Sequence, residues 1–163
     1  MCATFFGHVL QVSPFSEIAD TRVELFMLKK LWDFRSLVDN TFDDWKSQLW
    51  GQINTEDLED RTKKGLSIPL KQMGDAHPTM KAWAAYRTIE QRVRNMAAVL
   101  PLIAELHADA MRPRHWTQLS AVCKRREIPH TAPTFCLENV LELELHTHVD
   151  DVDEIVEVSG VSY

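Results

Sequence analysis

Glycine and proline are scarce in this sequence, whose 163 residues contain 5 Gly and 7 Pro. A β-sandwich needs many tight turns and a disordered tail is usually rich in both residues, so neither class fits. The 3 cysteines include no CxxC pair and cannot close a disulfide framework, which favours a reducing intracellular compartment. No apolar run approaches the roughly 20 residues that span a bilayer, and no Lys or Arg precedes Arg22 to form the basic start of a secretory signal. We therefore expect a soluble intracellular chain.

Sequence patterns of catalytic and metal-binding loops are missing too. Neither GxxxxGK(S/T) nor GxGxxG occurs, so we expect no nucleotide binding by this chain alone. The GxSxG turn of serine hydrolases is also absent. His146 and His148, with Cys123 and Cys136 nearby, lack the spacing of a zinc site, and the acidic run 150–154 lacks the glycine of a calcium loop. We interpret these side chains as solvated and expect no metal or other cofactor.

The net charge of −6 argues against a general nucleic-acid binder. The charges are unevenly distributed along the chain. Residues 79–126 contain nine Lys or Arg against three Asp or Glu, whereas residues 127–163 contain nine acidic residues and no Lys or Arg. Such opposite segments indicate either complementary faces within one fold or a charge pattern for a partner.

The strongest structural signal is an apolar stripe between Ile18 and Trp50. Its members recur at steps of four or three residues, which is the period of an amphipathic helix: Val23, Met27, Leu31, Phe34, Val38, Phe42, Trp45 and Leu49. Ser16 is placed to cap the start of this helix and Gly51 to follow its end. The apolar surface is widened by Leu25, Leu28, Trp32 and Leu37. We therefore expect the helix to be covered on more than one side.

A second helix is predicted to begin at Asn54 or Thr55, because either side chain can cap a helix whose first turn is acidic. Gly65 and Pro69 both disfavour a regular helix interior. The sequence therefore predicts that this second helix is broken or bent.

A third apolar stripe follows Pro78, a residue suited to the first turn of a helix. Pro101 falls inside this stripe and should kink the helix or split it in two. A further short helix is predicted to begin near Pro113 and to end with the basic residues 124–126, whose charges suit a helix C-terminus.

The C-terminal segment supports two interpretations. Leu141, Leu143 and Leu145 alternate as in a strand, whereas residues 137–156 also fit a helix that Thr134 could cap. We favour the helix, because every other predicted element is helical and a lone strand would leave its backbone groups unpaired. The whole chain is therefore predicted to be all-α, an elongated bundle of long amphipathic helices with breaks marked by proline.

Residues 112–116 combine basic side chains with a tryptophan, a composition that can contact phosphates and stack on bases. Five residues in an acidic chain are weak support for nucleic-acid binding. We favour a structural role, in which Trp116 is a buried anchor in helical register with Leu119. In this interpretation Arg114 or His115 satisfies exposed carbonyls at a helix end.

Five segments, in this order, resemble the dynein heavy-chain family: residues 30–34 (KLWDF), 42–46 (FDDWK), 52–58 (QINTEDL), 99–106 (VLPLIAEL) and 111–116 (MRPRHW). The RHW segment with the upstream Leu-Pro is the most specific part. The similarity extends through residues 135–156, which resemble the helix that follows RHW in this family. The axonemal branch is more similar than the cytoplasmic one, and the matching region is the N-terminal part of the linker.

The resemblance implies a helical, lever-like linker that arches over a ring of ATPase modules and changes shape during the power stroke of a microtubule motor. It implies a lead-in segment at 1–21, a partial linker domain at 22–163, and a chain that is one piece of a much longer protein. No catalytic position of the family has a match here. The resemblance therefore implies no catalytic, cofactor or metal residue in this chain, with ATP and Mg²⁺ bound by the ring of the parent motor.

A lever must resist bending, which closely packed aromatic anchors support, and proline marks positions where a helix can bend. On these grounds, and from the RHW motif, six residues are expected to be structural or interaction sites: Trp32, Trp45, Pro101, Arg114, His115 and Trp116.

The implied partners are the remainder of the heavy chain, especially its ATPase ring, and other dynein subunits. Microtubules are contacted only indirectly, and no nucleic acid or membrane is expected. The implied location is the cytoplasm and cytoskeleton, in the axoneme of a cilium or flagellum. The residues alone leave two other classes open: a helical scaffold or adaptor that binds a partner through its acidic C-terminal helix, and a small metal-dependent enzyme.

Overall fold

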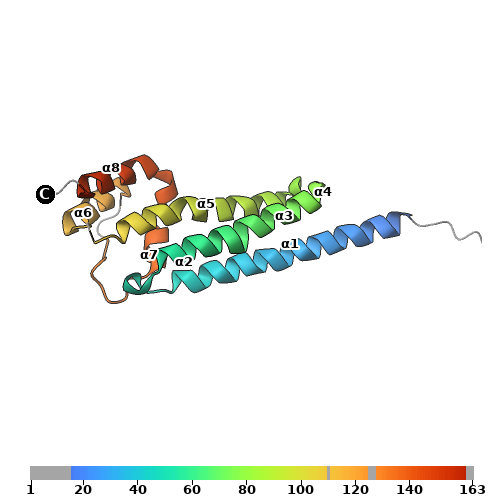
Figure 1. Cartoon of the computed structure of the whole chain (residues 1–163), viewed down its shortest axis with the longest axis horizontal. Helices are drawn as coiled ribbons and strands as arrows, with labels where there is room; N and C mark the ends of the chain where they lie inside the picture. Colours follow the sequence, from blue (N-terminus) through green and yellow to red (C-terminus); the bar gives the residue numbers. More distant parts are fainter. Residues whose placement is uncertain (1–15, 110, 125–127, 161–163) are drawn as a thin grey trace, which may run out of the picture.

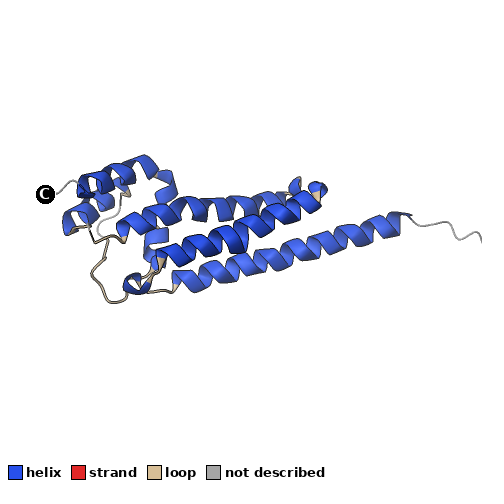
Figure 2. Ribbon diagram, viewed as in Figure 1, coloured by secondary structure: helices blue, strands red, loops and turns tan. Residues whose placement is uncertain are grey.

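The computed structural model describes residues 16–109, 111–124 and 128–160. The all-α prediction is confirmed, since the regular elements in these ranges are helices (Figure 2). The extended pairing found there is limited to one isolated bridge between Leu49 and Cys136.

Helix α1 (Ser16–Lys46) forms the first rod of an elongated arm (Figure 1). The predicted stripe faces the core, with six of its members buried: Met27, Leu31, Phe34, Val38, Phe42 and Trp45. The helix ends at Lys46, four residues before the predicted end at Trp50. Residues 50–52 form the separate 3₁₀ helix η1 (Trp50–Gln52). Gly51 therefore lies inside η1 and does not follow the end of α1.

The second rod is a chain of three helical pieces: α2 (Thr55–Asp60), the π-helical segment η2 (Arg61–Ser67) and α3 (Ile68–Ala76). Asn54 caps α2, because its side chain accepts a hydrogen bond from the backbone N–H of Asp57 at 3.1 Å. The predicted irregularity at Gly65 and Pro69 takes the form of a π-helical stretch, so the rod changes its hydrogen-bond register without ending.

The third rod is α5 (Ala84–Leu106), which follows the one-turn helix α4 (Pro78–Lys81). Pro78 occupies the first turn of α4, as predicted. Of the two outcomes expected at Pro101, a split is wrong, because α5 continues through this residue to Leu106, and a kink stays a prediction. The proline ring lies on the exposed side of α5, while its neighbours Leu100 and Leu102 are buried.

The second rod runs antiparallel to α1 and α5, which run in the same direction, and we call α1, the second rod and α5 together the arm (Figure 1). Apolar side chains fill the space between them, and charged pairs at the surface tie the rods together. Asp39 of α1 receives a hydrogen bond from Arg92 of α5 and lies 3.5 Å from Arg35 of its own helix. Exposed pairs of this kind contribute little stability individually, so the arm is held chiefly by its core.

Gly74 of α3 lies against the side chains of Lys81 and Tyr86. A Cβ atom there would lie 2.7 Å from Lys81 Cε and 2.9 Å from Tyr86 Cζ. The Tyr86 ring has little freedom to move, because it is buried and its hydroxyl donates to the carbonyl of Leu70 at 3.1 Å.

We therefore expect Gly74→Ala to lower the free energy of unfolding by about 1–3 kcal/mol, since overpacking outweighs the helix propensity of alanine. Gly65→Ala is the matched control, because no atom lies within 4 Å of its added Cβ. This control should stabilise the chain by up to about 1 kcal/mol. Urea denaturation of both variants checks the prediction, and equal shifts for the two would contradict it.

The remaining helices form a second unit, which we call the head: α6 (Pro113–Val122), α7 (Leu137–Leu141), the 3₁₀ helix η3 (Leu145–Thr147) and α8 (Val149–Gly160). It contacts the end of α5 opposite to α4 (Figure 1). Helix α6 begins at Pro113 as predicted but ends at Val122. Lys124 already has a left-handed φ of 52°, and residues 125 and 126 of the predicted basic end lie outside the described residues.

The C-terminal segment is helical, as favoured, but it is not one helix. Glu144 takes a left-handed conformation (φ 51°, ψ 44°) that separates α7 from η3. Leu143 and Leu145 flank this break and are both buried. In one straight helix, residues two positions apart point in different directions, so the break lets both side chains reach the core. The predicted cap Thr134 is also wrong. Cys136 is the N-cap of α7, and its backbone N–H donates to Asn139 Oδ1 at 3.0 Å.

The wide apolar surface predicted for α1 is left open by this chain. Figure 1 shows the N-terminal part of α1 extending past the ends of α3 and α5. The exposed apolar side chains of α1 are seven, each 37–60% exposed, and they flank the buried stripe on both sides: Ile18, Val23, Leu25, Phe26, Leu28, Trp32 and Leu37. The expectation that α1 is covered on more than one side is therefore wrong for this chain taken alone.

Candidate functional site

The ends of the arm and the head are joined at a junction of two loops. The loop after α1 pairs with the loop before α7: Trp50 N–H donates to the Phe135 carbonyl at 2.9 Å, and Leu137 N–H donates to the Gln48 carbonyl at 3.0 Å. His107, just after α5, contacts the Trp50 carbonyl through Nε2 at 2.9 Å. These backbone contacts fix the end of α1 to the head and to α5.

An aromatic cluster fills this junction. Trp116 of α6 stacks on His130 with ring centroids 5.0 Å apart and planes 4° apart. Its other neighbours are Trp50 at 5.7 Å and Phe135 at 6.0 Å, both in edge-to-face geometry. Trp50 also contacts His107 at 5.2 Å and Phe135 at 5.6 Å. The prediction that Trp116 is buried is confirmed, since its side chain is 5% exposed.

His115, beside Trp116, closes the start of α6 and is fully buried. Its Nδ1 accepts a hydrogen bond from the backbone N–H of Arg112 at 3.1 Å, and Arg114 Nε lies 3.0 Å from its Nε2. His115 thus accepts a hydrogen bond from a backbone N–H at the start of a helix. The prediction that Arg114 or His115 satisfies carbonyls at the end of a helix is wrong for His115 Nδ1, which is an acceptor. A histidine at the third helical position takes the place that Glu or Gln holds in the usual capping box.

The surroundings of His115 favour its neutral form. Burial lowers the pKa of this imidazole, and the positive charges of Arg114 and Arg112 lower it further. A neutral imidazole carries one ring proton, which is on Nε2 when Nδ1 accepts the hydrogen bond from Arg112. A second proton would have to bind Nδ1, where it would displace that hydrogen bond.

Stability should therefore fall as the pH drops below the ordinary histidine value of 6.5. Because the folded-state pKa is lowered, the unfolded chain binds more protons in this range and is favoured by acid. The contribution is fully present above pH 6.5 and is lost as the pH falls toward the folded-state pKa. Urea midpoints at neutral and mildly acidic pH check this. His115→Asn, whose amide oxygen can still cap Arg112, should show a shallower pH dependence; an unchanged slope would contradict the assignment.

The six residues expected as structural or interaction sites fall into separate places. Arg114, His115 and Trp116 come together at the junction. Trp45 is buried in the core of the arm, with its ring 5.7 Å from Phe42. Trp32 is 49% exposed on α1, where the Arg35 guanidinium lies 4.8 Å from its ring centre.

Pro101 lies on α5, where it lines a hollow with Lys63 and Leu100. No sequence pattern connects Trp116 with its junction partners Trp50, His107, His130 and Phe135. They are distant from Trp116 along the chain, so no local periodicity connects them.

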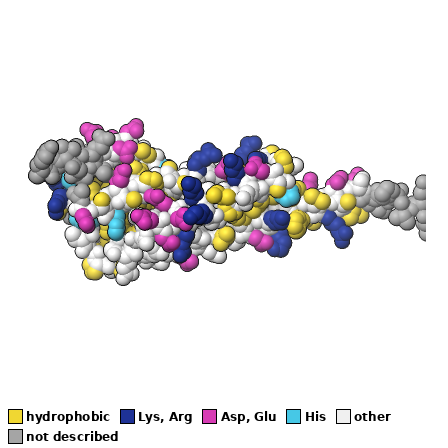
Figure 3. Space-filling model, viewed as in Figure 1, with side chains coloured by type: hydrophobic (Ala, Val, Ile, Leu, Met, Phe, Trp, Pro, Cys, Tyr) yellow, Lys and Arg dark blue, Asp and Glu magenta, His cyan; other side chains and the backbone are white. Residues whose placement is uncertain are grey.

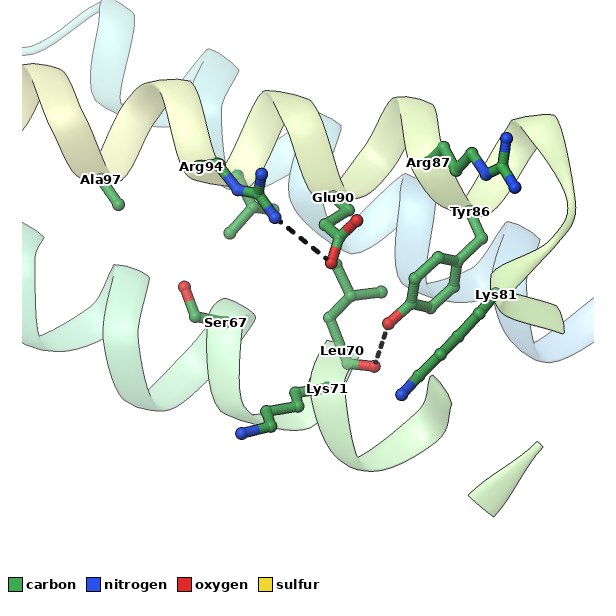
Figure 4. Close-up of a pocket in the computed structure, with 10 residues that line it drawn as sticks. Ser67, Leu70, Lys71, Lys81, Tyr86, Arg87, Glu90, Arg94 and Ala97 are labelled. Atoms are coloured by element: carbon green, nitrogen blue, oxygen red, sulfur yellow. Dashed lines mark hydrogen bonds and ion pairs between the residues drawn. The ribbon is translucent and has the colours of Figure 1, made fainter. Parts of the chain in front are cut away.

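A groove between the second rod and α5 was also missed (Figure 4). Figure 4 shows Glu90 and Arg94 of α5 facing Ser67, Leu70 and Lys71 across it. Figure 3 shows Lys and Arg side chains gathered over the middle of the arm. Within the described ranges, no group of three or more His, Cys, Asp and Glu side chains is arranged to hold a metal ion. No described helix has the length and apolar character needed to cross a membrane.

The sequence of this chain matches a known protein family over most of its length. The family model described as "Dynein heavy chain, N-terminal region 2" matches residues 18–160. The chain belongs to the dynein heavy-chain family, and the resemblance inferred from the KLWDF to MRPRHW segments is confirmed.

The similar curated proteins are axonemal, flagellar or ciliary dynein chains. The chain is 37% identical over 134 residues to the dynein beta chain of the flagellar outer arm of Chlamydomonas reinhardtii, which covers 82% of this chain and 3% of that protein. It is 35% identical over 140 residues to the alpha chain of the same arm, covering 86% of this chain and 3% of that one. It is 32% identical over 146 residues to dynein axonemal heavy chain 17 of Mus musculus, covering 90% of this chain and 3% of that protein. The chain thus spans 3% of the length of these relatives.

Proposed function

We propose that this chain is a non-catalytic lever, the N-terminal part of the linker of a microtubule-based motor heavy chain that acts in the axoneme of cilia or flagella. Membership of the dynein heavy-chain family and the axonemal, flagellar and ciliary names of its relatives support this proposal. The ATP and Mg²⁺ of the motor belong to the ring of the parent protein. The partners of the segment are that ring and the rest of the heavy chain, with other subunits possible and microtubules reached only indirectly.

The observation that carries the proposal is the arm fixed to the head at one end. Helix α1 has 31 residues, which corresponds to a length of about 46 Å. It packs on α5 over a continuous apolar core, and the loop after α1 is hydrogen-bonded to the head. Bending such a rod would open voids in a closely packed interior, so a displacement at one end is transmitted to the other.

Fluorescence energy transfer in the full-length heavy chain tests this role. A donor is placed at Arg22, an exposed residue near the start of α1, and an acceptor on the ATPase ring. We expect the transfer efficiency to differ between the nucleotide-free motor and the motor trapped with a nucleotide analogue. Equal efficiency in every nucleotide state would contradict a lever that moves relative to the ring.

The chain alone should not bind ATP, because its sequence contains no phosphate-binding loop with clustered glycines and a lysine. Calorimetric titration of the isolated chain with Mg-ATP is expected to give no saturable heat at micromolar nucleotide. Saturable micromolar binding would overturn the non-catalytic assignment.

The alternative is an adaptor that binds a partner through its acidic C-terminal helix. It is supported by the start of α8, where Asp150, Asp151, Asp153 and Glu154 are exposed. Replacing these four residues by Asn and Gln in the full-length heavy chain should leave motility unchanged if the chain acts as a lever. Loss of a bound subunit, with motility otherwise intact, would favour the adaptor.

A further inference from the structure

The groove between the second rod and α5 is made of two adjoining hollows. The larger has a volume of about 550 Å³ and lies between α3 and the first half of α5. The smaller, about 230 Å³, lies between η2 and the Pro101 region of α5. Ser67 and Ala97 line both hollows, so they form one continuous groove. From Tyr86 to Pro101 the groove follows about 22 Å of helix, enough for about 15 residues of a second helix laid alongside.

The floor of this groove is apolar. Leu70 and Val93 line the larger hollow and Leu100 lines the smaller, and all three are buried. Tyr86 closes one end, with its hydroxyl bonded to the Leu70 carbonyl (Figure 4). An apolar floor of this shape accepts the apolar side chains of an amphipathic helix.

The walls carry an excess of positive charge in the larger hollow, whose lining has four Lys or Arg against Glu90, whereas Glu59 and Lys63 both line the smaller one. Lys63 and Lys71 lie on the second rod and Arg87 on α5; all three are exposed. Among the ion pairs formed by described residues, none involves these three cations. Their charges are therefore available to a ligand.

Two further cations on the walls are only partly neutralised. Arg94 lies 3.6 Å from Glu90, and Lys81 is paired with Asp75. Arg87 and Arg94 are seven residues apart on α5, or two helical turns, about 10.5 Å. Carboxylates seven residues apart on a docked helix have the same spacing, so the groove is complementary to an acidic helix in register as well as in sign.

The acidic helix of this chain does not occupy the groove. Helix α8 lies with the head at the far end of α5, whereas the larger hollow lies near α4 (Figure 1). Helix α8 instead contacts α6 and α5.

We propose that the groove between the second rod and α5 binds an acidic amphipathic helix of a separate polypeptide. A charged rim around an apolar floor is typical of partners that associate and dissociate, whereas interfaces that are never exposed are more apolar. The exposed apolar side chains of α1 have this second character, and they suit permanent packing within the heavy chain. Binding at the groove does not depend on the lever role, so either proposal can fail without the other.

A designed helical peptide of about 18 residues tests the groove, with leucines on one face and glutamates at i, i+4 and i+7 on its flanks. Fluorescence anisotropy with the 163-residue chain is expected to show saturable binding that weakens as salt is raised. The double variant Lys71→Glu and Arg87→Glu should weaken binding by roughly tenfold, because attraction becomes repulsion at two positions. Arg22→Glu, the same charge change on an exposed α1 residue away from the groove, should change it less than about twofold. Circular dichroism confirms that the variants remain folded.

Several outcomes would overturn the proposal. The first is that a peptide with lysines in place of the glutamates binds as tightly as the acidic peptide. The second is that Arg22→Glu weakens binding as much as the double variant does. Tighter binding of a single-stranded RNA than of the acidic peptide would make the groove a nucleic-acid site. Self-association of the chain in sedimentation, abolished by the double variant, would make a second copy the partner. Peptide binding by this chain but not by a longer heavy-chain segment would show that the heavy chain itself covers the groove.

Discussion

Replacing Trp116 by alanine is expected to lower the free energy of unfolding by about 3–5 kcal/mol. The side chain is 5% exposed and holds the junction through its stack on His130 and its edge contacts with Trp50 and Phe135. Its removal leaves a cavity among groups from three separate segments, which cannot all close around it. Urea denaturation of the 163-residue chain measures the effect. A loss of this size is a large part of the stability of a typical domain.

Trp32→Ala is the matched control, because the same atoms are removed from a side chain that is 49% exposed. The Arg35 guanidinium lies over its ring, and exposed cation–π pairs contribute about 0.5–1 kcal/mol. We therefore expect a loss of less than about 1 kcal/mol. A Trp116 variant as stable as the Trp32 variant would show that the junction does not depend on its aromatic cluster.

Leu37→Pro is the second change with a large expected effect, at about 3 kcal/mol or more. Leu37 lies inside α1 with a side chain that is 49% exposed, so the substitution damages the backbone and spares the core. Proline removes an intrahelical N–H donor and clashes with the preceding turn. Leu37→Ala retains the backbone and should change stability by less than about 0.5 kcal/mol. Similar urea midpoints for the two variants would show that α1 is not a continuous helix at this position.

The sequence predicted the arm well because its signals are local. Six positions of the α1 stripe, from Met27 to Trp45, are buried as the period requires. Val23 is exposed although it belongs to the stripe, and Leu49 is exposed after the helix has ended. Periodicity identifies which face is apolar, but it does not reveal whether this chain supplies enough neighbours to cover that face.

The sequence predicted the head and the groove less well because they depend on contacts between distant segments. The break at Glu144 allows Leu143 and Leu145 both to be buried, a demand set by the surrounding helices. The groove brings residues 59–71 of the second rod next to residues 86–101 of α5, and no sequence motif indicates this arrangement. The cap at His115 could have been found, since an unusual capping residue three positions after Arg112 is a local signal.

Microtubule gliding by the full-length heavy chain tests the lever role most directly. The motor carrying Leu37→Pro is compared with Leu37→Ala and with the parent, and ATP hydrolysis is measured in the same preparations. We expect the proline variant to hydrolyse ATP at nearly the parent rate while it moves microtubules severalfold more slowly, because a broken rod does not transmit displacement. The alanine variant should match the parent in both. Equal gliding velocities for all three motors would contradict a lever built on α1.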